Sequence, residues 1–518
     1  AEVPDASHCP DEFPTWTEDG ADEPDCALAV VGAGAGGLYA AWRLVEAGTY
    51  AASDVCVFEA TERVGGRTYS ARYGALDLAV DAGAYRTWPE YTPVTHALIV
   101  EKLGLSVACY DPAEDPCEKF ILVDEAGHNA GFATYVEELA TKLFAQGARW
   151  FPRRRVASVA PRDPGLALTF ASGAQATAEK TILNIPQRPL LEIMRGSPSL
   201  GLDASAFAAA HAVQTEVVTK LYLYYDVAWW RELGLTSGDF KLDGDAANMP
   251  LKGRYHDGDV VCDDEDDPAT CRGFLLAVYD HDYSGEAAMF FRRYQRERPE
   301  PVTILSGATP EGAAFLAHAH ERLLECHVYM EDPPYTAYEA STVIGGAAPP
   351  TFGVLATWNA ATLGAGGGWH GWTDLGLSDA MPAALAAHGA FVVNEAYSLV
   401  QGCRAPRRIQ LQRTTRLDAV GLTGLFAHRG RGQPAGRRRR PGGPLRPRAP
   451  LGLRGVRVPR ARRPDGEDRL RGGDGDGAQR DQRRRYRSLR RRRALLPGQR
   501  VPAPGRRPAQ AAILGAGR

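Results

Sequence analysis

Residues 27–37, Ala-Leu-Ala-Val-Val-Gly-Ala-Gly-Ala-Gly-Gly, decide the fold of this chain. The apolar run 27–31 predicts a buried strand, and residues 38–46 have the periodicity of a helix. Between them stand three glycines with the spacing G-x-G-x-x-G: Gly32, Gly34 and Gly37. Residues 55–59 predict a second strand, so the whole segment predicts a βαβ unit that binds a dinucleotide at its glycine turn.

Each part of this unit has a separate task. The first glycine permits the tight turn, the second lets the backbone approach a pyrophosphate, and the third lets helix and strand pack closely. The N-terminus of the helix then faces the phosphates with free N–H groups. Glu59 ends the second strand 22 positions after Gly37, where a carboxylate accepts hydrogen bonds from a ribose diol. The predicted dinucleotide contacts are Gly32, Gly34, Ala35, Gly36, Gly37 and Glu59.

Residues 59–67 read Glu-Ala-Thr-Glu-Arg-Val-Gly-Gly-Arg. This segment resembles the second signature of the monoamine oxidase and L-amino-acid oxidase superfamily, an acidic strand end followed by R-x-G-G-R. The resemblance implies that the dinucleotide is FAD, with the Gly-Gly turn and the arginines near its phosphates. It adds four cofactor-binding residues, the last from a strand that meets the adenine: Arg63, Gly66, Arg67 and Val156.

Residues 81–86, Asp-Ala-Gly-Ala-Tyr-Arg, carry the resemblance to the substrate side. Gly83 and Ala84 resemble the small pair that lies against the flavin, and we count Tyr85 and Arg86 with the cofactor contacts. L-amino-acid oxidases have G-A-x-R here, and their arginine binds the substrate carboxylate. A planar guanidinium suits this task because it donates two parallel hydrogen bonds. The chain therefore resembles L-amino-acid oxidases most, and Arg86 is the predicted carboxylate-binding residue, although an Arg that pairs within the protein or touches only flavin is the alternative.

Two more residues are assigned by resemblance. Trp358 resembles an aromatic wall of the substrate site, and Lys241 is the nearest candidate, by order, for the catalytic lysine that holds a water near the flavin N5. Residues 220–230, KLYLYYDVAWW, resemble the strand that enters the substrate domain. The implied reaction is oxidative deamination of an L-amino acid to a 2-oxo acid and ammonia, with O2 reduced to hydrogen peroxide.

Two departures keep other functions open. Only 70 residues separate Arg86 from Val156, where L-amino-acid oxidases carry a larger helical insertion, so a monoamine or polyamine oxidase of the same fold is the alternative. The family closes its flavin site near the C-terminus with a G-E or G-D segment and then a G-W-x-x-G-A segment. Neither is found after Ala427, so an inactive flavoprotein is a third hypothesis.

The alternation of predicted helices and strands indicates the α/β class, with a Rossmann-type FAD-binding domain and an inserted mixed-sheet substrate domain. We expect an N-terminal arm over residues 1–25. The FAD-binding domain is expected at 26–90, 130–200 and 400–427, and the substrate domain at 91–129 and 201–399.

The tail, residues 428–518, differs in composition from the rest of the chain. It contains 28 Arg and only 6 acidic residues, whereas the whole chain has a net charge of −3. Such a segment cannot bury a core. It is either a disordered basic tail or an out-of-frame translation of a GC-rich gene, and we favour the second. The acidic body that remains argues against nucleic acid as a partner.

Nine cysteines indicate an oxidising compartment, because several stand as local pairs that suit disulfide-closed loops. The pairs are Cys9 with Cys26, Cys109 with Cys117, and Cys262 with Cys271, while Cys326 with Cys403 is a long-range possibility. Nine scattered buried thiols are the alternative. We expect a secreted or endomembrane-lumenal protein with no membrane span, a small amine or amino acid and O2 as its partners, and no metal site. The chain begins at Ala1, which favours a processed or partial N-terminus.

Overall fold

The computed structural model of the protein describes residues 24–281, 300–359 and 366–397, together with four single residues: Pro4, Phe290, Phe291 and Tyr294. Most of the predicted N-terminal arm, residues 400–427 and the tail 428–518 lie outside the described residues. Within the described part of the chain, no helix is long and apolar enough to cross a membrane.

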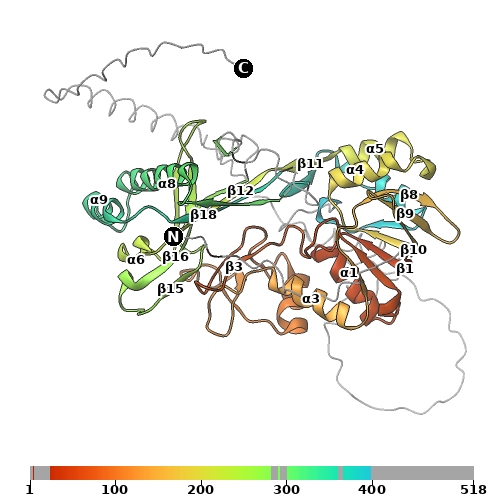
Figure 1. Cartoon of the computed structure of the whole chain (residues 1–518), viewed down its shortest axis with the longest axis horizontal. Helices are drawn as coiled ribbons and strands as arrows, with labels where there is room; N and C mark the ends of the chain where they lie inside the picture. The colour runs from red at the N-terminus through yellow and green to blue at the C-terminus, as the bar shows by residue number, and fades with distance from the viewer. Residues whose placement is uncertain are drawn as a thin grey trace, which may run out of the picture. The chain divides into compact units, whose positions relative to one another are not determined.

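A seven-stranded sheet, parallel in its middle, forms the nucleotide-binding domain (Figure 1). The strands run in the order β7-β2-β1-β10-β9-β8, and β20 also pairs with β10. The parallel strands are β1 (Asp25–Val31), β2 (Val55–Phe58), β7 (Arg149–Phe151), β10 (Gln175–Leu183) and β20 (Ala390–Val392). An antiparallel edge consists of β8 (Val156–Pro161) and β9 (Leu166–Phe170).

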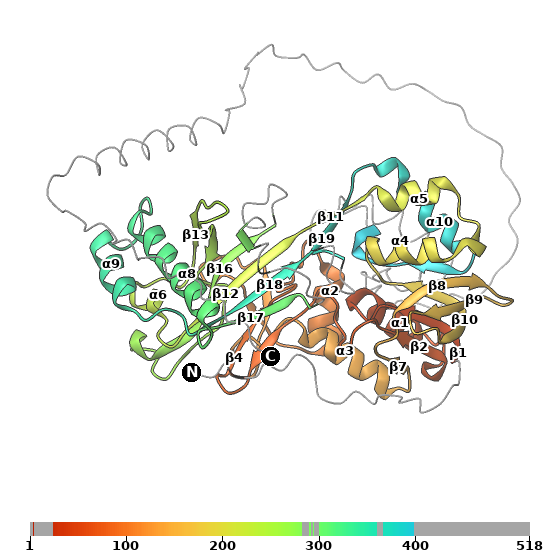
Figure 2. The same cartoon turned by 45° about the horizontal axis from the view of Figure 1, so that its top comes forward.

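Helices cover both faces of this sheet, as Figure 2 shows. One face packs against α1 (Ala35–Glu46) and α3 (Thr134–Ala145). The other face packs against α4 (Gln187–Gly196), α5 (Ala204–His211) and α10 (Ala380–Ala386). Because both faces are covered, β1 and β2 are buried along most of their length, which explains the unbroken apolar run at residues 27–31.

The predicted βαβ unit and the α/β fold class are confirmed. Leu28 lies beside Val55 in parallel register, and α1 connects the two strands. The predicted boundary near residue 399 is wrong in one respect. Residues 390–392 were expected in the substrate domain, but they form a parallel strand of the nucleotide-binding sheet against Thr181 to Leu183 of β10.

An antiparallel sheet forms the substrate domain, in the order β13-β14-β16-β12-β18-β17 with β15 on β16. Its strands are β12 (Val218–Tyr225), β13 (Asp239–Leu242), β14 (Leu251–Arg254), β15 (Val260–Cys262), β16 (Cys271–Asp280), β17 (Val302–Ser306) and β18 (Phe352–Trp358). One face packs against α8 (Pro310–Val328) and α9 (Ala337–Gly346), which share a core with Leu221 and Leu223 of β12 (Figure 1). The opposite face, with Tyr222 and Tyr224, is aromatic and packs against the tyrosines of residues 69–85.

Short elements connect these layers. They are η1 (Ala52–Asp54), β3 (Ala71–Tyr73), β4 (Leu78–Val80), α2 (Pro93–Ala97), η2 (Leu98–Leu103), β5 (Val107–Cys109), β6 (Phe120–Leu122), η3 (Pro198–Leu200), β11 (Val213–Glu216), α6 (Trp229–Glu232), η4 (Pro268–Thr270), β19 (Trp369–Trp372), η5 (Leu375–Leu377) and η6 (Glu395–Tyr397). Three two-stranded ribbons join β3 with β4, β5 with β6, and β11 with β19. The β3–β4 ribbon leads directly into residues 81–86.

Three disulfides are present among the described residues. Cys109–Cys117 and Cys262–Cys271 close the two predicted loops. The predicted partner of Cys26 is wrong. Cys26 pairs with Cys56, because the adjacent strands β1 and β2 bring the two Cα atoms to 6.0 Å, and Cys9 lies outside the described residues. Cys326 has no cysteine partner among the described residues, which do not include Cys403.

Removal of the Cys26–Cys56 disulfide has a measurable expected effect. We expect the Cys26→Ala, Cys56→Ala double variant to lose about 2–4 kcal/mol of unfolding free energy, because the disulfide closes a loop of 30 residues in the unfolded chain. The Cys262–Cys271 disulfide spans only 9 residues, so its removal should be milder by about 1 kcal/mol. Guanidinium unfolding of both double variants beside the wild type checks this order, and the reverse order would contradict it.

His327 at the end of α8 makes the stability depend on pH. It is 1% exposed, its Nδ1 donates to the Leu323 carbonyl at 2.7 Å, and its Nε2 accepts from the Tyr255 hydroxyl at 2.8 Å. Burial lowers the pKa of His327 from 6.5 to about 4. Between these two values the unfolded chain binds the proton and the folded chain does not, so this contribution is complete above pH 6.5 and is lost as the pH falls toward 4.

We therefore compare the wild type with His327→Gln at two pH values. Burial raises the pKa of Asp81 and of Asp259 to about 6, which favours the folded state as the pH falls from 6 to 3.8, but both proteins contain these groups. The stability advantage of the wild type should shrink by about 2 kcal/mol from pH 7 to pH 5. Denaturant melts at both pH values measure it, and a constant difference would show that His327 does not titrate as described.

Candidate active site

The glycine loop sits at the carboxyl end of β1. The Gly32 N–H donates to the Phe58 carbonyl at 2.8 Å, which ties the loop to β2. A Cβ on Gly37 would lie 2.4 Å from the Gly32 carbonyl oxygen, so only glycine permits this approach of α1 to the loop. The first helical hydrogen bond of α1 runs from the Leu38 N–H to the Gly34 carbonyl at 3.1 Å. The earlier N–H groups of the first turn are thus free to bind an anion.

The R-x-G-G-R turn lies beside this loop. The Gly65 N–H donates to the Ala33 carbonyl at 2.9 Å, and Gly34 pairs with Gly65 as an isolated bridge. The Arg63 guanidinium supports the turn by donating to the Gly66 carbonyl at 2.7 Å and lies 4.4 Å from the centre of the Tyr69 ring. Two glycine-rich backbone segments therefore form one cradle, which fits the pyrophosphate of a dinucleotide.

Glu59 stands where β2 ends and is 7% exposed. Its carboxylate accepts from the Ala33 N–H at 2.9 Å and from the N–H and hydroxyl of Thr61 at 3.0 Å. The Arg154 N–H donates to the Glu59 carbonyl at 2.7 Å, so the segment that enters β8 at Val156 passes this strand end. The structure thus brings Glu59 and the segment leading to Val156 together, at the predicted ribose and adenine end.

Arg67 faces a late segment of the chain. It donates to the Gly368 carbonyl and to Asn394 Oδ1, both at 3.0 Å. Asn394 in turn donates to Asn184 Oδ1 at 3.4 Å, and Asn184 donates to the Gly32 carbonyl at 3.1 Å. Sequence reasoning missed the two asparagines. Asn184 directly follows β10, and Asn394 lies two residues after β20. Their position at the carboxyl ends of parallel strands, where ligands bind in such sheets, is the signal that could have found them.

Residues 81–86 connect the cofactor side to the substrate side. The Gly83 N–H donates to the Tyr69 carbonyl at 2.9 Å, and the Ala84 N–H donates to the Arg67 carbonyl at 3.0 Å. A Cβ on Gly83 would lie 2.1 Å from the Arg67 carbonyl oxygen, so this position requires glycine. Gly83 and Ala84 are therefore neighbours of the R-x-G-G-R turn. Their contact with a flavin stays a prediction.

Arg86 projects from this segment between two tyrosine rings. Its Cζ lies 4.7 Å from the centres of both Tyr85 and Tyr110. Among the described residues it has no hydrogen-bond acceptor and no ion-pair partner, and its side chain is half-buried. The guanidinium donors of Arg86 therefore meet aromatic faces and no acceptor within the described part of the chain.

Two stretches of the chain match known families. Residues 30–103 match the family described as NAD(P)-binding Rossmann-like domain, and residues 122–286 match the family described as flavin containing amine oxidoreductase. Together with the glycine cradle, the second match decides the chemistry. The chain is an FAD-dependent amine oxidase.

Solved structures of putrescine oxidase are among those similar to this chain. The wild type bound to putrescine has 15% sequence identity and a TM-score of 0.47, with 77% of this chain and 100% of that chain covered. A triple mutant from a redesign of its cofactor binding has 16% identity and a TM-score of 0.48 at the same coverage. At this level of similarity, the substrate of putrescine oxidase says nothing about the substrate of this chain. No curated protein sequence matches the oxidase.

Lys241, the predicted catalytic lysine of the oxidase, does not lie at this site. It is on the edge strand β13, its side chain is 67% exposed, and its Nζ lies 3.6 Å from Asp243 Oδ1. Lys220 of the central strand β12 lies here instead, 1% exposed, with its Nζ 4.0 Å from the centre of the Tyr85 ring. Its side chain shares the aromatic face with Tyr222, because alternate residues of a strand point the same way.

Lys220 is surrounded by acceptors. It donates to the carbonyl of Asp81 at 2.7 Å and of Gly83 at 2.9 Å, and its Nζ lies 3.5 Å from the Tyr222 hydroxyl. Burial lowers the pKa of the Lys220 ammonium to about 8, against the opposing effects of Asp257 and Asp81. It is therefore mostly protonated at neutral pH.

Asp257 organises the tyrosines around the two cations. It is 6% exposed and accepts from the Tyr110 hydroxyl at 2.7 Å and from the Tyr222 hydroxyl at 3.0 Å. Arg254 donates to the Tyr110 hydroxyl at 2.9 Å and forms an ion pair with Asp239 at 3.2 Å. The Tyr110 ring, which lies against Arg86, is thus held in place by Asp257 and Arg254.

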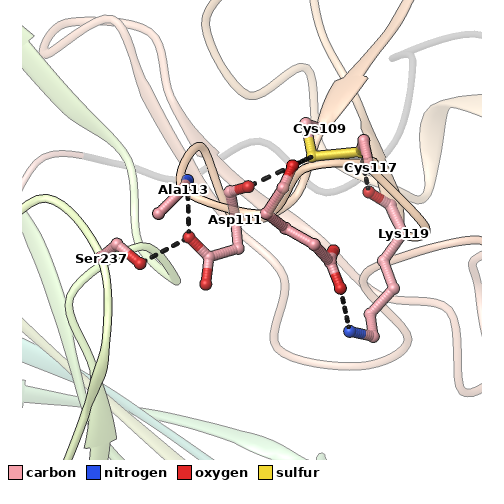
Figure 3. Close-up of a disulfide and its surroundings, with 7 residues drawn as sticks. Cys109, Asp111, Ala113, Cys117, Lys119 and Ser237 are labelled. Atoms are coloured by element: carbon pink, nitrogen blue, oxygen red, sulfur yellow. Dashed lines mark hydrogen bonds and ion pairs between the residues drawn. A yellow bond between two sulfur atoms is a disulfide. The ribbon is translucent and has the colours of Figure 1, made fainter.

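Tyr110 lies between Cys109 and Cys117 in the sequence. Figure 3 shows the disulfide that closes this loop. Cys109 and Cys117 close the loop, and within it Asp111 accepts from the Ser237 hydroxyl at 2.6 Å. Lys119 donates to Glu114 at 2.8 Å, which holds the other end of the loop. The disulfide and Ser237 therefore anchor the residue that contacts Arg86.

Trp358 is next to the site but does not line an open wall. It is 2% exposed, its Nε1 donates to the Ala82 carbonyl at 2.8 Å, and its ring meets the edge of Tyr69. Trp358 packs against residues 81–86 and is hydrogen-bonded to them through Ala82. The Trp358 side chain therefore has almost no surface in this structure that a substrate could contact.

Proposed function

We propose that the oxidase deaminates L-amino acids, yielding a 2-oxo acid, ammonia and hydrogen peroxide. The observation that carries this proposal is the guanidinium of Arg86, which has no acceptor or counter-ion among the described residues and lies two positions after Ala84. An amine without a carboxylate offers nothing to this group. An α-carboxylate offers two coplanar oxygens that match its donors.

The residues of the chain supply binding and orientation in this reaction. Bound FAD would accept a hydride from the substrate α-carbon and return the electrons to O2. Arg86 would hold the carboxylate, while Tyr85 and Tyr110 hold Arg86 and keep water from its flanks. The imino acid released takes up water and gives the 2-oxo acid and ammonia. A substrate fixed through its carboxylate reacts from one orientation.

A polyamine oxidase of the same fold is the weaker alternative. Three cations lie around the Tyr85 ring, namely Arg86, Lys220 and Arg254. Asp239 pairs with Arg254 and Asp257 lies among the tyrosines, but among the described residues Arg86 itself has no counter-ion. A substrate with two ammonium groups would be repelled by this arrangement. The charge at the site therefore favours a substrate that brings a carboxylate.

A peroxide assay with matched substrate pairs tests the proposal. Each L-amino acid is compared with the amine that lacks only its carboxylate, for example phenylalanine with 2-phenylethylamine and ornithine with putrescine. We expect peroxide from the amino acids and little from the amines. The opposite preference would establish an amine oxidase, and no peroxide from either class with FAD bound would favour an inactive flavoprotein.

We also propose a secreted or endomembrane-lumenal location. The three disulfides Cys26–Cys56, Cys109–Cys117 and Cys262–Cys271 support it, since such bonds persist in oxidising compartments. Thiol titration of the denatured protein, isolated from its source without reductant, tests this proposal. Reactive thiols at all nine cysteines would contradict it.

A further inference from the structure

We propose that Lys220 is a positioning residue for Arg86: its ammonium group fixes the turn at residues 81–83 and thereby sets how tightly the site holds the substrate carboxylate. The inference rests on the proposed function, because it takes Arg86 as the group that binds the carboxylate. Lys220 itself does not touch the substrate in this proposal.

The contacts of Lys220 converge on one turn. Its Nζ donates to the carbonyls of Asp81 and Gly83, which are two residues apart. Arg86 follows three residues later, so the ammonium fixes the chain from which Arg86 projects. The Tyr222 hydroxyl shares its one proton between Asp257 at 3.0 Å and the same Asp81 carbonyl at 3.2 Å, which adds a second restraint to the turn.

The burial of Lys220 argues for a specific task. A fully buried ammonium loses its hydration, and carbonyl oxygens and aromatic faces compensate for this loss only in part. Its lowered pKa reflects the same penalty. At an ordinary core position of β12 an apolar side chain would be more stable, as Leu221 and Leu223 on the opposite face illustrate. What the buried ammonium adds is two hydrogen bonds that fix the backbone at residues 81–83.

The network extends from the turn to both rings at Arg86. Lys220 lies against the Tyr85 ring, and Tyr222 connects it to Asp257, which fixes Tyr110. The backbone before Arg86 and the two rings beside its guanidinium thus belong to one hydrogen-bonded unit. Loss of the ammonium should therefore loosen Arg86 without removing its charge.

The test uses binding as well as turnover. In the full-length holoprotein, Lys220→Met is compared with wild type for the affinity of benzoate, measured by the change in the bound flavin spectrum, and for KM and kcat with an L-amino acid. We expect benzoate to bind about 10-fold more weakly and KM to rise by a similar factor, while kcat changes by less than about 3-fold. KM for the matched amine should not change.

Lys241→Met is the matched control, because it removes an exposed lysine from the same sheet. It should leave benzoate affinity and KM as in wild type. If Lys220→Met does not fold or does not retain FAD, Lys220→Gln and Tyr222→Phe replace it. Tyr222→Phe removes the Asp81, Asp257 and Lys220 contacts of one hydroxyl, and a benzoate affinity about 2- to 3-fold weaker is expected.

The outcomes separate this inference from the proposed function. Unchanged benzoate affinity in the folded Lys220 and Tyr222 variants, together with weak binding in Arg86→Met, overturns the role of Lys220 and leaves the proposed function intact. Unchanged benzoate affinity in Arg86→Met overturns the proposed function, and the inference about Lys220 with it.

Discussion

Arg86→Met is expected to raise the KM for L-amino acids by about 100-fold, with a smaller effect on kcat. The substitution removes two charge-assisted hydrogen bonds to the carboxylate, which together contribute about 3 kcal/mol, and each 1.4 kcal/mol corresponds to a factor of ten in affinity. Met keeps the unbranched apolar stem of the side chain but not the guanidinium that lies against Tyr85 and Tyr110, so the contacts of the cation with both rings are lost as well. Steady-state peroxide assays measure the change.

Two comparisons make this result specific. Arg86→Lys keeps the positive charge but loses the planar pair of donors, so we expect a KM between those of the wild type and Arg86→Met. Arg153→Met removes an exposed arginine paired with Glu62 and should have no effect. If Arg86→Met leaves KM for amino acids unchanged, Arg86 does not bind the carboxylate and the amine oxidase alternative gains support.

The cofactor half of the site could be predicted from the sequence because its parts are near one another in the chain. The loop at Gly32, the strand end at Glu59 and the turn at Gly65 are joined by hydrogen bonds through Ala33. Local patterns of glycine and apolar residues determine such geometry, since backbone contacts carry it. The predicted positions needed no information from distant strands.

The substrate half depends on contacts between distant segments. Lys220 and Gly83 are 137 positions apart, and only the pairing of β12 with β16 and β18 shows that Lys220 is enclosed. Lys241 was chosen by its order in the chain, which carries no information on burial. It lies on the edge strand β13, where a lysine remains in solvent.

The late strand β20 was missed for a related reason. Ala390–Val392 is too short to show a period, and it is recognised as a strand of the nucleotide-binding sheet only through its pairing with β10. Asn394 then reaches Arg67 and Asn184. A short strand with a distant partner leaves no local signal, so sequence reasoning expected the end of the domain at 400–427 instead.

The backbone pairing of residues 83–84 with 67–69 joins the two halves of the site. Because Ala84 bonds to the Arg67 carbonyl, a change that displaces the R-x-G-G-R turn also displaces the segment that carries Arg86. We therefore expect damage to the glycine cradle to reach the substrate side as well as the cofactor.

Gly32→Ala tests the cradle directly, and we expect it to abolish retention of FAD and to lower the unfolding free energy by about 3 kcal/mol. Gly32 has φ +97°, and a Cβ there would lie 2.5 Å from the Asn184 carbonyl oxygen, so the change combines backbone strain with a collision against rigid backbone. Gly48→Ala is the matched control. Gly48 has φ +69° but no atom within 4 Å of a Cβ, so only strain of about 1 kcal/mol is expected, and FAD should be retained. The ratio of flavin to protein absorbance in the purified variants and their thermal unfolding measure both effects. Full FAD occupancy in Gly32→Ala would show that the loop between β1 and α1 does not hold the cofactor.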